Sequence, residues 1–182
     1  NGVALDYFDP AACFPSVERA AGPLLVFTGQ MDYRPNVEAV AWFAAEVLPR
    51  LRQTHPAVRF AIVGRAPTAA VQALAAPDVI VTGAVDDVRP WLAAASVCVA
   101  PLHLARGIQN KVLEAMAMAR PVVASPAAAE GIDHAGTLRV AGSAAEQARA
   151  IGALLDDPDA ASALGEAARV RVLARYDWAA RL

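Results

Sequence analysis

Two short apolar runs, separated by a glycine-bearing loop and a helical pattern, constrain the fold of this chain most strongly. The runs occupy residues 97–100 (VCVA) and 121–124 (PVVA), and apolar residues recur at helical spacing over 111–119. Such runs are typical of strands buried inside a parallel sheet. Strand, loop, helix and strand in this order predict a βαβ unit. Its loop lies at the carboxyl end of a strand, where open α/β sheets bind ligands.

The loop at residues 101–110 leads directly into a helix N-terminus, which predicts an anion site. Unpaired backbone N–H groups and the positive end of the helix dipole favour an anion such as a diphosphate. Gly107 allows a positive φ, and Lys111, the single lysine of the chain, adds a charge. Glu114 projects from the same side of the helix as Lys111, where a carboxylate suits paired ribose hydroxyls. The residues alone favour a nucleotide site, although an ordinary glycine turn and a dipole-stabilised glutamate explain the same pattern.

Apolar runs alternate with helical patterns along the whole chain, which predicts the α/β class with a doubly wound parallel sheet. The other expected strands occupy 24–28, 60–63, 79–81 and 137–140. The other expected helices occupy 35–53, 68–75, 87–95, 143–155 and 158–176. Asp87 and Ser143 are the expected N-caps of two helices, and Glu146 completes a capping box with Ser143. Residues 1–22 contain several breakers and are expected to be irregular.

Composition excludes several classes of function. With 57% hydrophobic and 19% charged residues, the 182 residues suffice for one buried core, and no apolar run approaches the length of a membrane span. The formal net charge of −2 gives no reason to expect nucleic acid or an anionic membrane as a partner. Cys13 and Cys98 are far apart in the sequence, so no disulfide between them is expected. The expected compartment is therefore a reducing cytoplasm. His55, His103 and His134 are scattered, so no metal site is expected.

A series of short motifs follows a fixed order along the chain. It comprises FTG at 27–29, VG at 63–64, TGAVDD at 82–87, PL…G…NKVLEAMAMARPVVAS within 101–125, and a Tyr-x-Trp at 176–178. In this order the motifs resemble the C-terminal half of a GT-B glycosyltransferase, of the retaining group 1 type (family four). The stretches FTGQMDYRPNVEAV and ARGIQNKVLEAMAMARPVVA are similar to a bacterial branch associated with exopolysaccharide synthesis. The resemblance covers nearly all of the chain.

The resemblance implies a domain organisation. In the family two Rossmann-like domains face each other across a cleft, the C-terminal one binding the nucleotide-sugar donor and the N-terminal one the acceptor. Residues 23–182 are therefore expected to form the donor-binding domain, residues 1–22 a linker segment, and the acceptor domain is missing. Residues 177–182 would begin a final helix that crosses to the other domain. The implied location is cytoplasmic, with peripheral contact to the inner face of the membrane through the missing domain left open.

The resemblance also assigns roles to residues of the 106–114 loop and helix. Glu114 matches the second of two paired glutamates, the one that binds ribose hydroxyls. The first glutamate falls at Arg106, a reversal of charge, and Arg106 is expected to bind the diphosphate or an acidic sugar, with a surface arginine of no role as the alternative. Lys111 is expected to add positive charge for the departing diphosphate. The backbone amides that match the family's phosphate cradle belong to Gly107, Ile108, Gln109 and Asn110.

Loops after the earlier strands supply the other expected donor contacts. In the family an arginine and, six residues later, a lysine contact phosphate, but here these positions hold Gln30 and Asn36. Arg34 is expected to replace part of the missing charge. The further expected contacts are Gly29, Gly64, Arg65, Gly83 and Val85, with a solvated arginine as an equal reading of Arg65. We find no Asp-x-Asp motif placed to bind a diphosphate through Mg²⁺, so metal independence is expected.

The leading interpretation is the donor-binding half of a retaining glycosyltransferase that uses a UDP- or GDP-linked sugar, a glycan or lipid-linked acceptor and no cofactor. The expected catalytic residues are Glu114, Lys111 and Arg106, and the isolated fragment is expected to be inactive. Two alternatives stay open. One is a GT-B sugar-nucleotide epimerase, and the other is a non-catalytic nucleotide-sugar binding module, which the changes at positions 30, 36 and 106 favour slightly.

Overall fold

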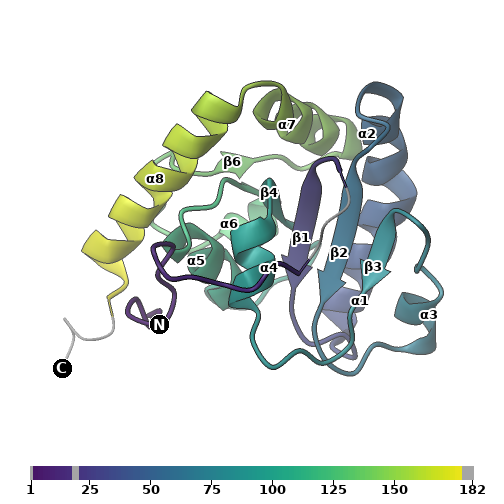
Figure 1. Ribbon diagram of the computed structural model, residues 1–182, viewed down its shortest axis with the longest axis horizontal. Helices are drawn as coiled ribbons and strands as arrows, with labels where there is room; N and C mark the ends of the chain where they lie inside the picture. Colours follow the sequence, from purple (N-terminus) through teal and green to yellow (C-terminus); the bar gives the residue numbers. More distant parts are fainter. Residues whose placement is uncertain (1, 18–20, 178–182) are drawn as a thin grey trace.

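The computed structural model describes residues 2–17 and 21–177, which form a six-stranded parallel sheet flanked by helices (Figure 1). The strands are β1 (Leu24–Thr28), β2 (Arg59–Val63), β3 (Val79–Val81), β4 (Val97–Ala100), β5 (Val122–Ala124) and β6 (Arg139–Val140). Their order is β3-β2-β1-β4-β5-β6, and every neighbouring pair is parallel. This is the doubly wound order of a Rossmann-like fold, so the predicted fold class is confirmed.

Helices lie on both faces of this sheet. They are α1 (Arg34–Trp42), α2 (Leu48–Thr54), α3 (Ala69–Gln72), α4 (Arg89–Ala94), α5 (Asn110–Ala117), α6 (Pro126–Ala129), α7 (Ala144–Asp156) and α8 (Pro158–Arg175). Figure 1 shows α4 in front of the sheet and α1 behind it. Because parallel crossovers are right-handed, the reversal of strand order between β1 and β4 also places α1 and α5 on opposite faces.

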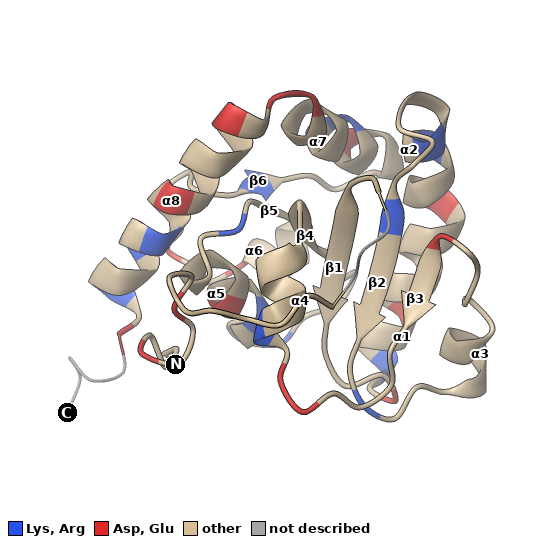
Figure 2. Cartoon of the chain, viewed as in Figure 1, with Lys and Arg blue, Asp and Glu red and all other residues tan. Residues whose placement is uncertain are grey.

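The sequence of each strand explains its position. The central strands β1, β4 and β5 read LLVFT, VCVA and VVA, and each residue in them is buried. Such uninterrupted apolar runs are required where helices cover both faces of a sheet. Figure 2 shows charged residues mainly on the helices and loops, with exceptions at the start of β2 (Arg59) and in β6 (Arg139). The core therefore extends along both faces of the sheet.

The helix predicted over 35–53 contains a π-helical turn, η1 (Phe43–Val47), between α1 and α2. Pro49 lies in the first turn of α2. Proline has no N–H, and its ring clashes with the carbonyl group four residues earlier in a regular α-helix. The wider π turn lets the chain continue past Pro49 in the same direction.

Some predicted boundaries differ from the structure. The predicted N-cap role of Asp87 is wrong, because α4 begins at Arg89 and its N-cap residue is Val88. Asp87 lies one position earlier, and its carboxylate accepts a hydrogen bond from the Arg89 backbone N–H at 2.9 Å. The short helix α6 was not predicted, although Ser125 caps it with a side-chain hydrogen bond to Ala128. The strand expected over 137–140 contains two residues.

The predicted capping box at α7 is confirmed. The Ser143 hydroxyl accepts from the Glu146 backbone N–H at 3.1 Å, and the Glu146 carboxylate accepts from the Ser143 N–H at 3.3 Å. Replacing Ser143 with alanine should lower the free energy of unfolding by about 1 kcal/mol, measured by urea denaturation. Ser162→Ala, at an exposed position inside α8, is the matched control and should cause no loss. Equal losses in the two variants would contradict the capping role.

The described part of the segment that was expected to be a linker packs against the sheet and its helices. Residues 2–17 contain no helix, as expected, and Val3 and Phe8 are buried. The Arg89 guanidinium lies over the ring of Tyr7, 3.7 Å from its centroid, and donates to the Tyr7 carbonyl at 2.9 Å. Apart from Asp177, the helix expected over 177–182 lies outside the described residues.

Candidate functional site

The carboxyl ends of the strands open onto a depression beside the point where strand order reverses. It holds about 1070 Å³ of space, including open solvent. It is lined by Thr28, Gly29, Gln30, Asn36, Val63, Gly64, Arg65, Ala84, Val85, Val88, Asn110, Lys111 and Glu114. These residues come from the ends of β1 and β2, the loop after β3, and helices α1 and α5. In open α/β sheets this is the place where ligands bind.

Close backbone contact between the ends of β1 and β2 requires two glycines. Gly64 has a φ of +155°, and a Cβ on it would lie 1.6 Å from the carbonyl oxygen of Gly29. A Cβ on Gly29 would lie 2.7 Å from the side-chain nitrogen of Asn36. The Gly29 N–H donates to the Val63 carbonyl at 3.0 Å and holds the two strand ends together. These glycines therefore have a packing requirement in addition to any contact with a ligand.

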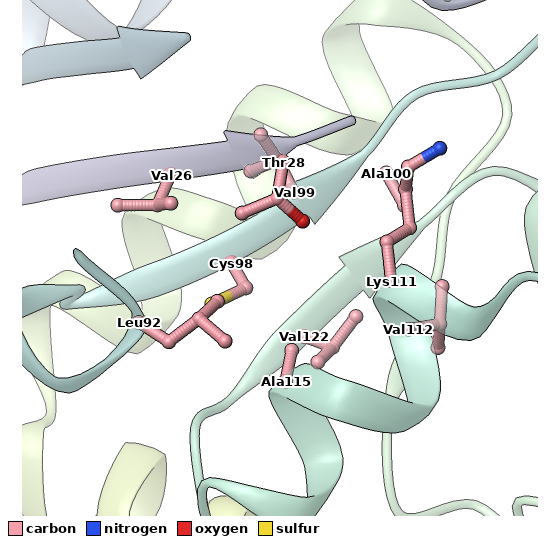
Figure 3. Close-up of a pocket in the computed structure, with 10 residues that line it drawn as sticks. All are labelled: Val26, Thr28, Leu92, Cys98, Val99, Ala100, Lys111, Val112, Ala115 and Val122. Atoms are coloured by element: carbon pink, nitrogen blue, oxygen red, sulfur yellow. The ribbon is translucent and has the colours of Figure 1, made fainter. Parts of the chain in front are cut away.

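Lys111 extends from the first turn of α5 across the ends of the strands. Figure 3 shows its side chain running past Ala100, at the end of β4, beside an apolar space between α5 and the sheet. Its Nζ donates to Oδ1 of Asn36 at 2.9 Å and lies 5.0 Å from the ring centroid of Phe27. Burial lowers the pKa of Lys111 to about 8, and the charge of Glu114 opposes this shift. A positively charged group is thus held at the edge of the depression.

Glu114 lies one turn further along the same face of α5. Burial raises the pKa of Glu114 to about 7, although the positive charge of Lys111 works in the other direction. Among the residues that the structure describes, none donates a hydrogen bond to this carboxylate. A half-buried carboxylate with unused acceptor capacity can accept hydrogen bonds from two hydroxyl groups of a ligand.

Asn36 was placed at the position of the family's phosphate-contacting lysine but was not among the expected contacts, yet it lines the depression. Only 4% of its surface is exposed. Its Nδ2 donates to the Gln30 carbonyl at 2.9 Å, while its Oδ1 accepts from Lys111. The sequence signal was its place at the position of the family's phosphate-contacting lysine, in the first turn of a helix that follows a glycine loop.

The rim of the depression near β2 is also hydrogen-bonded. Arg65 donates from Nη2 to the Gln30 side-chain oxygen at 2.9 Å, and the Gln30 side-chain nitrogen donates to Asp32 at 2.6 Å. The backbone N–H of Met31 donates to the Arg65 carbonyl at 2.8 Å. The loops after β1 and β2 are therefore tied to each other, and Arg65 lies with its guanidinium at the edge of the depression.

The structure brings seven of the predicted site residues together in the depression: Gly29, Gly64, Arg65, Val85, Asn110, Lys111 and Glu114. The others do not line it. Arg34 has a side chain that is 87% exposed and pairs with Glu38 at 2.6 Å. Gly83 has a φ of +67° with open space around it, and residues 106–109 lie on the neighbouring exposed or half-buried loop. Their assignments as donor contacts stay predictions.

The loop before α5 keeps its backbone donors available. Gly107 has a φ of +67°, as its place in a tight turn suggested. The backbone N–H groups of residues 107–110 have no hydrogen-bond acceptor within the described residues. The Gln109 side chain instead donates to the Gly107 carbonyl at 3.2 Å, which stabilises the turn. This arrangement fits an anion at the N-terminus of α5.

No group of three or more histidine, cysteine, aspartate or glutamate side chains gathers as a metal site within residues 2–17 and 21–177. Asp157 and Asp159 do have Asp-x-Asp spacing, but Asp157 caps α8 by accepting from the Ala160 N–H at 3.0 Å. Pro158, between them, borders a second depression together with residues that precede β1, β4 and β5. These two carboxylates therefore lie near the amino ends of the strands, whereas Lys111 lies at their carboxyl ends.

Within residues 2–17 and 21–177, no helix combines the length and apolar character of a membrane span.

Residues 22–157, most of the chain, match the family described as "Glycosyl transferases group 1". The chain belongs to this family. No curated protein matches this group 1 glycosyltransferase chain. The resemblance inferred from the motifs is thereby confirmed at the level of the family.

Solved structures support the same architecture for this group 1 chain. HepE of Anabaena, in complex with UDP and glucose, is 18% identical with a TM-score of 0.79 over 97% of this chain and 52% of its own. Sucrose-phosphate synthase of Thermosynechococcus elongatus is 25% identical with a TM-score of 0.75, and the match covers 98% of this chain and 48% of the synthase. The C-terminal domain of the group 1 protein LpcC from Francisella tularensis is 18% identical with a TM-score of 0.71, and the match covers 97% of this chain and 100% of the LpcC domain.

The extent of these similarities indicates which part of such a protein this chain represents. The chain spans about half the length of HepE and of the sucrose-phosphate synthase, but the whole of the LpcC C-terminal domain. The expectation of a C-terminal GT-B domain is thereby confirmed for the fold.

Proposed function

We propose that this chain is the donor-binding domain of a retaining glycosyltransferase. The proposed reaction transfers a sugar from a UDP- or GDP-linked donor to a glycan or lipid-linked acceptor in polysaccharide synthesis. The observation that carries the proposal is the placement of Lys111 and Glu114 on one face of α5, beside the depression where strand order reverses. The complex of the similar protein HepE with UDP and glucose supports a nucleotide-sugar donor.

The geometry suggests how the donor is held. The free N–H groups of residues 107–110 and the dipole of α5 would bind the diphosphate, and Lys111 would contact it from the side. Glu114 would accept hydrogen bonds from the two ribose hydroxyls. The base would then lie against the loops after β2 and β3, where Val85 and Val88 provide apolar surface. Each of the polar contacts uses a group whose hydrogen-bonding capacity is not filled within the described protein.

The same groups would assist the chemical step. As the bond between the sugar and the diphosphate breaks, negative charge grows on the diphosphate, and the amides and the Lys111 ammonium stabilise it. In the proposed mechanism the acceptor attacks from the face that the diphosphate leaves, so that the configuration is retained without a covalent enzyme intermediate. We propose that this stabilisation needs no metal ion. Arg106, on the exposed loop, is proposed to contact the diphosphate or an acidic sugar.

The acceptor side of the reaction is proposed to come from an N-terminal domain, so the 182-residue chain should bind donor without transferring it. We place the full reaction in the bacterial cytoplasm, in exopolysaccharide synthesis, with peripheral contact to the membrane through that other domain. A protein that binds nucleotide sugars but never transfers them, even when joined to its N-terminal domain, would instead be the non-catalytic module.

Glu114→Ala should weaken binding of the preferred nucleotide, UDP or GDP, by about 1–3 kcal/mol, because charge-assisted hydrogen bonds to the ribose are lost. This corresponds to roughly a 5- to 150-fold rise in Kd, measured by isothermal titration calorimetry. Glu166→Ala, at an exposed position of α8, is the matched control and should leave the Kd unchanged. An unchanged affinity in Glu114→Ala would reject the ribose assignment.

A further inference from the structure

We propose that Asn36 is a positioning residue, which holds the Lys111 ammonium over the end of β1 as the cation for the donor diphosphate. The inference rests on the proposed function, because it concerns the diphosphate part of the same site. The two side chains come from α1 and α5, on opposite faces of the sheet, and meet at 2.9 Å across the point where strand order reverses. Their hydrogen bond therefore closes the floor of the depression between the two layers of helices.

The surroundings of Asn36 fix the orientation of its amide. Its Nδ2 donates to the Gln30 carbonyl, which can only accept, so the Oδ1 must face Lys111. A Cβ at position 29 would come within 2.7 Å of this Nδ2, so Gly29 provides the space that Asn36 occupies. With 4% of its surface exposed, the amide cannot rotate away to solvent. The position is thus shaped to present one acceptor oxygen to the ammonium group.

A neutral acceptor at this place has a specific consequence. An amide oxygen satisfies one of the three N–H donors of Lys111 and leaves its charge intact, whereas a carboxylate would neutralise it. The ring of Phe27, 5.0 Å away, covers a further side of the ammonium. The remaining donors are free for a ligand in the depression that Lys111 lines.

The neighbouring cations differ from Lys111 in this respect. Arg34 pairs with Glu38, and Arg65 donates to the Gln30 side chain. Both side chains are exposed, whereas Lys111 is half-buried and held by a buried partner. The geometry therefore selects Lys111 as the cation with a fixed position at the diphosphate subsite.

The test separates the diphosphate from the nucleoside by measuring UDP and uridine, with GDP and guanosine as a second pair. Asn36→Asp keeps the shape of the side chain but adds a negative charge at the ammonium. We expect it to raise the Kd of UDP tenfold or more and to change the Kd of uridine less than twofold. UDP would be measured by calorimetry and uridine by ligand-observed NMR, with thermal melting to verify folding.

A double variant tests position rather than fold. Lys111→Asn alone should weaken UDP binding, and adding Asn36→Lys returns one ammonium and one amide to the same place from opposite helices. The double variant should recover UDP affinity to within about fivefold of the wild type. Recovery of this kind is not expected if Asn36 only stabilises the fold.

The outcomes distinguish the two levels of the proposal. A wild-type chain that binds neither nucleoside nor nucleotide rejects the proposed function, and the inference with it. Wild-type binding of uridine with no gain from the diphosphate rejects the positioning role alone. The role is also overturned if Asn36→Asp weakens UDP and uridine equally, or weakens neither. Should Asn36→Asp fail to fold, a double variant that binds UDP no better than Lys111→Asn overturns it.

Discussion

Gly64→Ala is expected to lower the free energy of unfolding by about 3–5 kcal/mol and to weaken nucleotide binding at least tenfold. The new Cβ would lie 1.6 Å from the Gly29 carbonyl oxygen, so the ends of β1 and β2 must separate. The φ of +155° adds backbone strain for any residue with a side chain. Urea denaturation and calorimetry with UDP measure the two effects.

Gly83→Ala is the matched control for this substitution. Gly83 also has a positive φ, +67°, but a Cβ there meets nothing within 4 Å. The cost should therefore be limited to the left-handed backbone, about 1–2 kcal/mol. Similar losses in the two variants would show that close contact between the strand ends is not what requires Gly64.

Lys111→Met should raise the Kd of UDP by roughly 10- to 150-fold at pH 7, which corresponds to about 1.5–3 kcal/mol for a charge-assisted hydrogen bond. The wild type should also lose affinity as the pH rises. The pKa of Lys111 is lowered to about 8, so the group is charged at pH 7 and mostly neutral at pH 9. Since only the ammonium form attracts the diphosphate, the wild-type Kd should rise about tenfold over this range.

The loss of affinity with rising pH can be assigned to the Lys111 ammonium, because the Lys111→Met variant lacks this group and should lack this loss. Glu114 is the charged group that acts on Lys111, and it titrates near pH 7, so it is ionised over most of this range. Any change that remains in Lys111→Met belongs to the ligand or to other groups. Arg149→Met removes a positive charge from an exposed position on α7 and should retain the wild-type profile. A profile in Lys111→Met identical to that of the wild type would contradict the assignment.

Local sequence determines most of the fold, which explains why its prediction succeeded. Runs such as LLVFT and VCVA can be satisfied only between two layers of helices, and Ser143 with Glu146 defines a helix start within four residues. The errors occur where longer-range packing decides. The helix α4 begins at Arg89, whose guanidinium donates to the Asp87 carboxylate and the Tyr7 carbonyl. No pattern in the sequence signals this contact between segments 82 residues apart.

The site was predictable to the extent that its groups follow strand ends. The carboxyl ends of parallel strands lie at the same end of the sheet. Residues that follow these strands in sequence therefore lie near the depression, as is the case for Gly29, Gly64, Lys111 and Glu114. Asn36 could not be recognised in this way, because its role arises from a contact between helices on opposite faces, 75 residues apart in sequence. Sequence spacing also does not show where a long side chain points, and Arg34 turns outward to Glu38.

The packing of residues 2–17 has a practical consequence for producing this domain. Residues 2–8 supply Val3, Leu5 and Phe8 to the core, and the Val3 N–H donates to the Tyr176 carbonyl at 3.0 Å. A recombinant domain trimmed to start at residue 22 would lack these side chains, would uncover the apolar surface beneath them, and would leave the Arg89 guanidinium without the Tyr7 ring. A recombinant domain for crystallography or ligand screening should therefore begin before Val3 and not at the first strand.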